Sequence, residues 1–319
     1  MLGVPPKCWT GAAVTVLENG HVDSPPPGQH RRYPGKTDAK SNGGSKMSSE
    51  AEWTEETRQK FLRYLGRHLV ALTGSYRLTD DAATSEERPF NYTGCIVTAN
   101  GEWFVLTAGH AIQAHVKAVN EGLIEITGRV LADYFGINAA NRQPIPFDII
   151  EQPKIYTDDV TSGLDYALLT LNSNQRQLLE SNDIMPLRIC AAPLPPLDQL
   201  YRYFVVGFPE ERVDLTPTPL DRPVNVAIQP HCVPLQREPD DTRARYPRFR
   251  GRIIEMGDLQ SIVGLSGGPI FGFVNQGDHQ DYYLVAIQSR CIINQRVNFG
   301  CLATAICDDC PTRLPKLPN

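Results

Sequence analysis

The chain has 319 residues, of which 41% are hydrophobic and 21% charged, so it can bury a sizeable core and is not disordered throughout. Its 31 Lys and Arg against 36 Asp and Glu give a formal net charge of −5, which argues against a protein whose whole surface binds nucleic acid. No apolar run approaches the ~18–20 residues of a membrane-spanning helix, and eight cysteines are too few for a disulfide-dense miniature scaffold. A soluble, β-rich protein is expected.

The first part of the chain predicts a disordered leader. Residues 1–48 are rich in Pro, Gly, Ser and charge. The apolar segment 12–17 lacks the basic start and the small-residue cleavage site of a signal peptide, so secretion is the less favoured interpretation. Met47 opens a more typical N-terminus, which suggests the hypothesis that residues 1–46 do not belong to the native protein.

Residues 49–84 predict an N-terminal helix followed by a linker. Apolar side chains recur at helical spacing over residues 54–73, and Gly74 is a plausible stop signal. These side chains are Phe61, Leu62, Leu65, Leu69 and Leu72. The helix could pack on the body of the protein, or it could dock a regulatory protein partner, and the pattern leaves both interpretations open.

From residue 85 onward the pattern changes to short strands joined by turns. The predicted strands are 93–98, 103–107, 123–130, 145–150, 166–171, 201–206, 224–228, 249–255, 269–273, 282–288 and 301–306. A Pro-rich linker over residues 176–200 separates one β unit at about 85–175 from another at about 201–310. The pattern predicts an all-β protein of two units with a tail at residues 311–319.

A candidate nucleophile lies in the segment Gly-Leu-Ser-Gly-Gly-Pro at residues 264–269. Glycines around Ser266 allow a tight turn that brings backbone N–H groups near a reacting carbonyl, although glycine-rich turns with serine are also common without catalysis. The segment also fits the nucleophile elbow of α/β-hydrolases. That alternative is rejected because only His279 follows Ser266, and because residues 269–273 predict a strand rather than a helix.

A candidate base and a candidate acid precede this serine. Of the seven histidines, only His110 follows a predicted strand and two small residues, which is where a scaffold presents a catalytic group. Asp165 begins an apolar strand, so its carboxylate is expected to be partly buried and to need a partner. Asp158 and Asp159 are alternative acids, but they lie in a polar turn.

The order His110, Asp165, Ser266 resembles the His, Asp and Ser motifs of the trypsin-like (chymotrypsin-fold) serine proteases, especially the compact bacterial type. The resemblance covers roughly residues 85–310. It implies two six-stranded antiparallel β-barrels, here with an N-terminal helical and disordered extension. The active site would lie between the two barrels.

The resemblance also implies roles for single residues. Ser266 would attack the scissile carbonyl, His110 would act as general base and then general acid, and Asp165 would orient the imidazole. The backbone amides of Gly264 and Ser266 would form the oxyanion hole. The reaction would need no cofactor and no metal.

Two positions are expected to bind substrate. Ser289 resembles the serine that opens the substrate-pairing strand and lies beside the catalytic acid, although an ordinary strand-end serine is nearly as well supported. Gln260 stands six residues before Ser266, where the family often places the floor of the S1 pocket. A neutral amide there favours an uncharged P1 residue, unless a loop of different length places Asp258 at this position instead.

The sequence departs from the family at three informative positions. Ala111 and Ile262 stand where many secreted members have cysteines, so neither of those disulfides is expected and a cytoplasmic location is favoured. Leu265 stands where those members have an Asp that pairs with a newly cut N-terminus. Activation by such a cleavage is therefore not expected, and control would come from elsewhere, such as the N-terminal helix.

Two further features are weighed and discounted. Cys307 and Cys310 form a lone Cys-x-x-Cys, whereas a zinc site needs four ligands, with Cys291 and Cys301 the nearest others. Five arginines crowd residues 243–252, but a solvated strand and loop is favoured over a nucleic-acid site.

The sequence thus predicts a serine endopeptidase that acts on protein or peptide substrates, without nucleic-acid or membrane binding. Two alternatives stay open. One is a catalytically silent, protease-like binding module, and the other is a regulatory module whose protease is latent until a partner engages the N-terminal helix.

Overall fold

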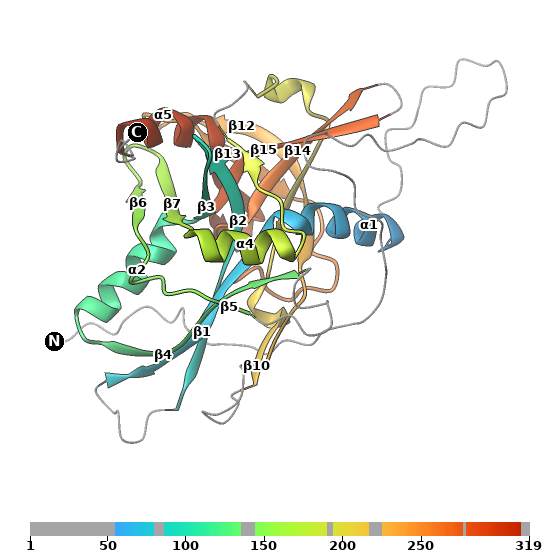
Figure 1. Ribbon diagram of the computed structural model, residues 1–319. Coiled ribbons are helices and arrows are strands. Elements are labelled where there is room, and N and C mark those ends of the chain that lie inside the picture. Colours follow the sequence, from blue (N-terminus) through green and yellow to red (C-terminus); the bar gives the residue numbers. More distant parts are fainter. Residues whose placement is uncertain are drawn as a thin grey trace, which may run out of the picture.

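The computed structural model describes residues 55–79, 86–134, 144–189, 194–216, 225–276 and 279–313. The predicted leader at residues 1–48 and the last residues of the predicted tail lie outside these ranges. The described part is mostly β-structure with few helices, as the strand pattern predicts. Figure 1 shows the two β units side by side, the first coloured blue to green and the second mainly yellow to red.

The first β unit is an antiparallel sheet in the order β5-β4-β1-β2-β3-β7-β6, with the short β8 pairing in parallel beside β2. Its strands are β1 (Leu69–Leu78), β2 (Arg88–Ala99), β3 (Glu102–Thr107), β4 (Ile124–Asp133), β5 (Ile145–Pro146), β6 (Lys154–Asp159), β7 (Leu164–Thr170) and β8 (Leu187–Arg188). Helix α2 (Gly109–Asn120) connects β3 to β4, and helix α4 (Ser173–Ser181) follows β7.

The second β unit is a closed barrel in the order β12-β13-β16-β15-β14-β9. Its strands are β9 (Arg202–Gly207), β12 (His231–Asp241), β13 (Arg248–Ile253), β14 (Pro269–Gln276), β15 (His279–Ile292) and β16 (Val297–Leu302). A separate two-stranded ribbon consists of β10 (Val213–Thr216) and β11 (Asn225–Ile228). Short 3-10 turns are η1 (Gly66–His68), η3 (Leu197–Gln199), η4 (Glu210–Arg212) and η5 (Ile293–Gln295).

The prediction of two six-stranded barrels is confirmed for the second unit only. In the first unit the described strands pair as an open sheet whose edges are β5 and β6. The two edge strands are linked by the short segment 147–153, but they do not pair with each other. One edge, β5, is only two residues long, so it offers few backbone groups for closing the sheet.

The N-terminal helix is shorter than predicted, and a strand follows it. Helix α1 (Glu55–Leu65) ends well before Gly74, and β1 lies in the sheet between β4 and β2. Residues 69–72 are fully buried, which is typical of a strand covered on both faces. Their apolar run satisfies a helical pattern equally well, so periodicity alone does not separate the two structures. The first β unit therefore begins before the predicted boundary at residue 85.

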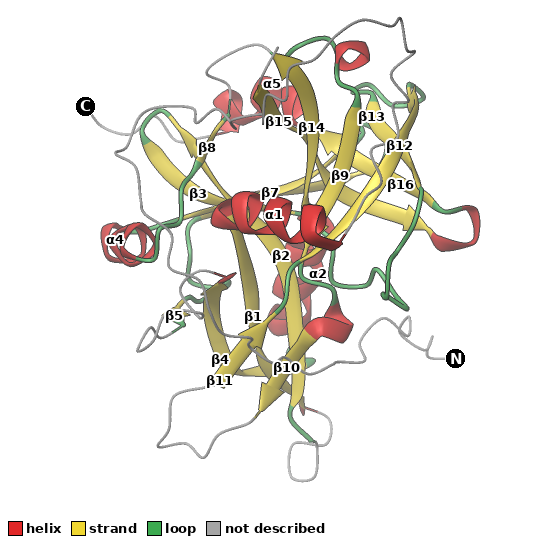
Figure 2. Ribbon diagram, turned by 90° about the vertical axis from the view of Figure 1, so that its right-hand side faces the viewer, coloured by secondary structure: helices red, strands yellow, loops and turns green. Residues whose placement is uncertain are grey.

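Helix α1 packs on the outside of the barrel (Figure 2). The ring of Phe61 lies 5.6 Å from that of Phe204 on β9 and 5.1 Å from that of Phe273 on β14. Leu65 is fully buried in the core. The apolar face of the helix is thus covered by the chain's own barrel, as the first of the two interpretations expects.

The arginine cluster is matched by acidic residues of β12. Arg243 and Arg248 form ion pairs with Asp241, while Arg250 and Arg252 form ion pairs with Glu238. These pairs join β12 to β13 and the loop between them, so much of the positive charge is neutralised locally.

The chain ends in a helix that the strand pattern does not predict. Helix α5 (Ala303–Arg313) follows β16 directly, and Asp309 on it accepts a hydrogen bond of 2.6 Å from the Tyr166 hydroxyl on β7. Cys310 is a buried free thiol, so the two cysteines of the Cys-x-x-Cys segment are not joined to each other. Within the described ranges, no helix is long and apolar enough to cross a membrane.

Candidate active site

The first turn of α2 places His110 against β7. Gly109 precedes it, and a Cβ at this position would collide with the carbonyl groups of Thr157 and Tyr166. The helix start can therefore approach β6 and β7 closely only because residue 109 has no side chain. The N–H of His110 is one of the amides that a helix N-terminus leaves without an intrahelical acceptor.

Asp165 receives three hydrogen bonds from the surrounding groups. His110 Nδ1 lies 2.8 Å from Asp165 Oδ2, and the backbone N–H of His110 donates to Oδ1 at 2.9 Å. The Ser289 hydroxyl, on β15, donates to Oδ2. The two bonds to His110 fix the imidazole ring and place a proton on Nδ1, so Nε2 is left to accept a proton.

Electrostatics favour the charged forms of this pair. Burial by itself lowers the pKa of His110, but the hydrogen bond and the negative charge of Asp165 outweigh it and raise that pKa above its ordinary value. Burial by itself raises the pKa of Asp165, and the contacts with His110 and Ser289 more than offset it, so that this pKa is lowered. Asp165 is therefore an anion at neutral pH.

The loop that carries Ser266 packs against the end of β3. Gly264 and Gly267 have φ angles of +89° and +83°, which glycine adopts without strain. A Cβ at Gly267 would collide with the Thr107 hydroxyl and the Thr93 carbonyl. The Gly267 N–H donates to the Gln288 carbonyl at 2.8 Å, one residue before Ser289. These contacts bring half-buried Ser266 to the same region as His110 and Asp165.

Two buried threonines fasten this loop, and sequence reasoning missed both. Thr93 on β2 donates to the Gly264 carbonyl at 2.8 Å and accepts the Phe208 N–H at 2.9 Å. Thr107 donates to the Thr93 carbonyl at 2.6 Å. Each is a hydroxyl next to apolar residues of a predicted strand, which was the available signal, because a buried hydroxyl needs a partner.

Some backbone N–H groups of the loop donate hydrogen bonds within the protein and others do not. The N–H groups of Leu265, Gly267 and Gly268 donate to carbonyls at 3.1, 2.8 and 2.8 Å. Those of Gly264 and Ser266 have no acceptor among the residues that the structure describes. These two amides are the ones predicted for the oxyanion hole.

Ser266 Oγ itself has no hydrogen bond to His110 in the described part of the chain. Such a bond is often long or poorly aligned until substrate binds. The structure thus joins His110, Asp165 and Ser289 by hydrogen bonds and brings the Ser266 loop beside them. The hydrogen bond between the nucleophile Ser266 and the base His110 is not formed among the described residues.

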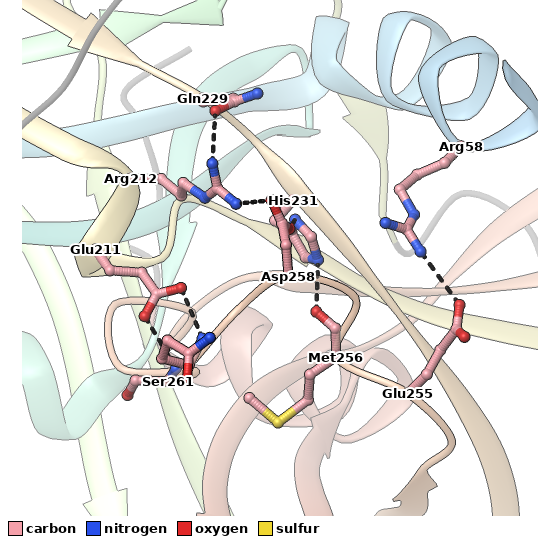
Figure 3. A network of polar contacts seen from close by, with 10 residues as sticks. Arg58, Glu211, Arg212, Gln229, His231, Glu255, Met256, Asp258 and Ser261 are labelled. Carbon is pink, nitrogen blue, oxygen red and sulfur yellow. Dashed lines mark hydrogen bonds and ion pairs between the residues drawn. The ribbon is translucent and has the colours of Figure 1, made fainter. Parts of the chain in front are cut away.

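The segment predicted to line the S1 pocket is held by its backbone (Figure 3). Glu211 accepts the N–H groups of Gln260 at 2.9 Å and Ser261 at 3.0 Å. The Gln260 side chain is exposed. Asp258 forms an ion pair with Arg212, which also contacts Gln229 at 3.3 Å (Figure 3). Asp258, the alternative to Gln260, therefore already has a cationic partner.

The same loop is tied to β12 and to the N-terminal helix. His231 Nε2 lies 3.1 Å from the Met256 carbonyl, and Arg58 on α1 forms an ion pair with Glu255 at 3.2 Å (Figure 3). Burial lowers the pKa of His231, so this histidine is neutral and structural. Residues 255–258 thus contact an element that lies outside the barrel.

Buried histidines elsewhere are also structural. Burial lowers the pKa of His68 and of His115 to about 4, and their rings pack against Phe271 and Phe90 respectively. Among the described residues, no group of three or more His, Cys, Asp or Glu side chains could hold a metal ion.

Two buried amides near the site were not singled out by sequence reasoning. Gln288 on β15 and Asn298 on β16 are buried residues of two neighbouring strands of the barrel. The signal was available for Asn298, which is a lone amide in an otherwise apolar strand. What the sequence does not show is whether a buried amide has found a partner.

Two solved structures are similar to this chain. A thermostable serine protease, AL20, from an extremophilic microorganism has 15% identity and a TM-score of 0.43, and the match covers 74% of this chain and 91% of that one. Protease Anisep from Arthrobacter nicotinovorans has 16% identity and a TM-score of 0.39, covering 74% and 90%. No protein family and no curated protein matches the sequence.

Proposed function

We propose that this chain is a serine endopeptidase that hydrolyses peptide bonds through an acyl-enzyme intermediate. The observation that carries the proposal is the set of hydrogen bonds on Asp165, which orients His110 beside a glycine-rich loop that presents Ser266. The three side chains are the ones that acyl transfer needs, namely an acid (Asp165), a base (His110) and a nucleophile (Ser266).

Ser266 would attack the carbonyl carbon of the scissile bond while His110 Nε2 takes the hydroxyl proton. The imidazolium would then give that proton to the leaving amine, and the acyl group would stay on Ser266 Oγ. In the second half, a water would attack the acyl carbon and give a proton to His110, which would return it to Ser266 Oγ as the ester bond breaks and the acid product leaves. Asp165 stays ionised throughout and stabilises the imidazolium. No cofactor enters either half.

The amides of Gly264 and Ser266 would stabilise the negative charge on the carbonyl oxygen. Their freedom from internal acceptors supports this role, since an oxyanion donor must be available when charge develops. Ser289 acts on Asp165 rather than on the reacting atoms, so its catalytic part is one of positioning.

A second candidate is a silent or partner-gated protease-like module. This candidate is favoured because Ser266 and His110 share no hydrogen bond in the described part of the chain. The burial of the apolar face of α1 speaks against gating through that face, because a partner could not reach Leu65 without displacing the helix.

Labelling with a fluorophosphonate probe separates these candidates. The folded chain should be labelled at Ser266 and should hydrolyse a peptide library. Ser266→Ala should abolish both, while the free energy of unfolding changes by less than about 1 kcal/mol, because a half-buried serine without side-chain partners has little packing to lose. A folded chain that is neither labelled nor active would support the silent or gated module.

A further inference from the structure

The barrel contains two buried amides whose polar atoms lack partners. Asn298 is 0% exposed and Gln288 is 3% exposed. Both the nitrogen and the oxygen of the Asn298 amide, and the oxygen Oε1 of Gln288, have no hydrogen-bond partner in the described part of the chain. Buried polar groups in native proteins are nearly always paired, so three such atoms together indicate that something absent from the chain itself satisfies them.

These two residues lie on one face of the barrel. Gln288 pairs directly with Gly300, and Asn298 lies two residues from Gly300 on the same strand. Side chains two apart on a strand share a face, and diagonal neighbours across a strand pair are ~7–8 Å apart, within reach of long side chains. Gln288 and Asn298 therefore form one polar pair, called here the amide pair.

The amide pair begins beside the nucleophile. The Gln288 N–H donates to the Gly268 carbonyl, and its own carbonyl accepts the Gly267 N–H, both at 2.8 Å. Ser266 directly precedes Gly267, and Ser289 directly follows Gln288. The backbone of Gln288 therefore lies beside the Ser266 loop, and a substrate whose carbonyl carbon meets Ser266 would have its adjacent side chain near this strand.

The unpartnered atoms define the chemistry that fits them. They are one amide nitrogen, which donates, and two amide oxygens, which accept. A carboxamide supplies the complement, because its nitrogen carries two N–H donors and its oxygen accepts. An ammonium group has no acceptor for Asn298 Nδ2, a carboxylate has no donor for the two oxygens, and an alkyl group leaves all three atoms unpaired.

We propose that the amide pair, Gln288 and Asn298, recognises the P1 side chain of the substrate, and that this side chain is a carboxamide, glutamine or asparagine. The inference rests on the proposed endopeptidase function and names its substrate class. It also assigns recognition to the barrel strands β15 and β16 instead of the exposed Gln260.

A peptide series tests the proposal on the wild-type protein. The peptides differ only at P1, which is Gln, Asn, Leu, Glu or Lys, and kcat/KM is measured for each. Gln or Asn should exceed Leu by on the order of 10- to 100-fold, because the apolar side chain leaves buried polar groups unpaired. If Leu, Glu or Lys is cleaved as well as the carboxamides, the amide pair is satisfied by buried water alone and the proposal is wrong.

Variants of the two amide residues test the proposal independently. Asn298→Leu and Gln288→Leu should each lower the ratio of kcat/KM for P1 Gln over P1 Leu by on the order of 10-fold or more. Asn182→Leu is the matched control, since it replaces a buried amide that donates to Asp133 away from Ser266, and it should leave the ratio unchanged. An unchanged ratio in both barrel variants would overturn the proposal.

The two levels of the proposal fail differently. If the wild-type protein cleaves no peptide and is not labelled at Ser266 by the fluorophosphonate probe, the endopeptidase function itself is wrong. If it is labelled and active but shows no preference for a P1 carboxamide, only the role of the amide pair is wrong.

Discussion

At the scale of single residues, the chemistry of the site depends on which ring nitrogen of His110 carries a proton and on whether the ring is charged. Its Nδ1 and its backbone N–H both face Asp165, so the acid fixes the ring and holds its pKa above the ordinary value. The imidazole is the base only when neutral. Activity should therefore be lost as the pH falls through this raised pKa, which lies above the reference of about 6.5.

Titration of His110 by NMR checks this directly. In Ser266→Ala protein, the midpoint should lie above about 6.5. In the double variant with Asp165→Asn, the hydrogen bond to an anion and its charge are gone, and burial remains as the dominant influence, so the midpoint should fall below that value. Activity of Asp165→Asn alone should drop by about 10⁴-fold. A midpoint that does not move would contradict the charged pairing.

Gly109 carries a second prediction at this scale. Gly109→Ala should lower both the melting temperature and kcat, because a Cβ cannot fit against the Thr157 carbonyl and the start of α2 must move away from β7. A misplacement of about 1 Å can cost on the order of 10²-fold in rate. Gly122→Ala, at a position with open space around it, tests whether steric contact matters, although its positive φ adds some strain there. Equal loss of kcat in the two variants would contradict the steric argument.

At the scale of elements, α1 acts as part of the barrel rather than as a free docking element. Phe61, Leu62 and Leu65 pack into its core, and Arg58 reaches the loop at residues 255–258. The helix therefore contributes to stability and touches the loop in which sequence reasoning placed the S1 floor.

Truncation of one core side chain tests the contribution of α1. Leu65→Ala should lower the free energy of unfolding by about 2–5 kcal/mol, as expected for a fully buried leucine. Arg63→Ala on the exposed side of the same helix should leave the melting temperature unchanged. Chemical denaturation of both variants measures the difference, and equal stabilities would show that α1 is not integral to the fold.

At the scale of the whole molecule, the candidate site forms where the sheet meets the barrel. His110 lies on α2 and Asp165 on β7 of the first β unit, whereas Ser266 lies in the loop before β14 and Ser289 on β15 of the barrel. Thr93 joins the two units, since its hydroxyl bonds to Gly264 and Phe208 across the boundary. Correct placement of the nucleophile therefore depends on how the two units dock.

Thr93→Val tests that dependence. The change leaves the Gly264 carbonyl and the Phe208 N–H without their partner, which should cost about 1–3 kcal/mol for each buried group and lower kcat on the order of 10²-fold. Thr93→Ser should restore most of the loss. Thr73→Val, which removes a buried hydroxyl bonded to Phe90 at 3.0 Å, should cost stability without a comparable loss of kcat. Equal kcat in all three variants would show that Thr93 does not position the loop.

The β-rich class and the chain order of His110, Asp165 and Ser266 follow from the sequence alone, whereas the catalytic roles of these residues stay a proposal. These features are local, since they depend on strand alternation, on glycines that permit a turn, and on the reactivity of single side chains. The resemblance also led us to expect Ser289 beside the acid, and its hydroxyl donates to Asp165, while the role of the Gly264 and Ser266 amides stays a prediction.

The remaining features depend on contacts between distant parts of the chain. The tertiary structure made residues 69–78 a strand, because pairing on both sides outweighs a pattern that fits a helix equally well. It left the first sheet open, exposed Gln260, and bonded Thr93 to the loop that carries Ser266. Each of these outcomes depends on strand register between segments far apart in the chain, as in the bond between Ser289 and Asp165, 124 residues away. Register is fixed by the fit of whole faces and not by any local run of residues.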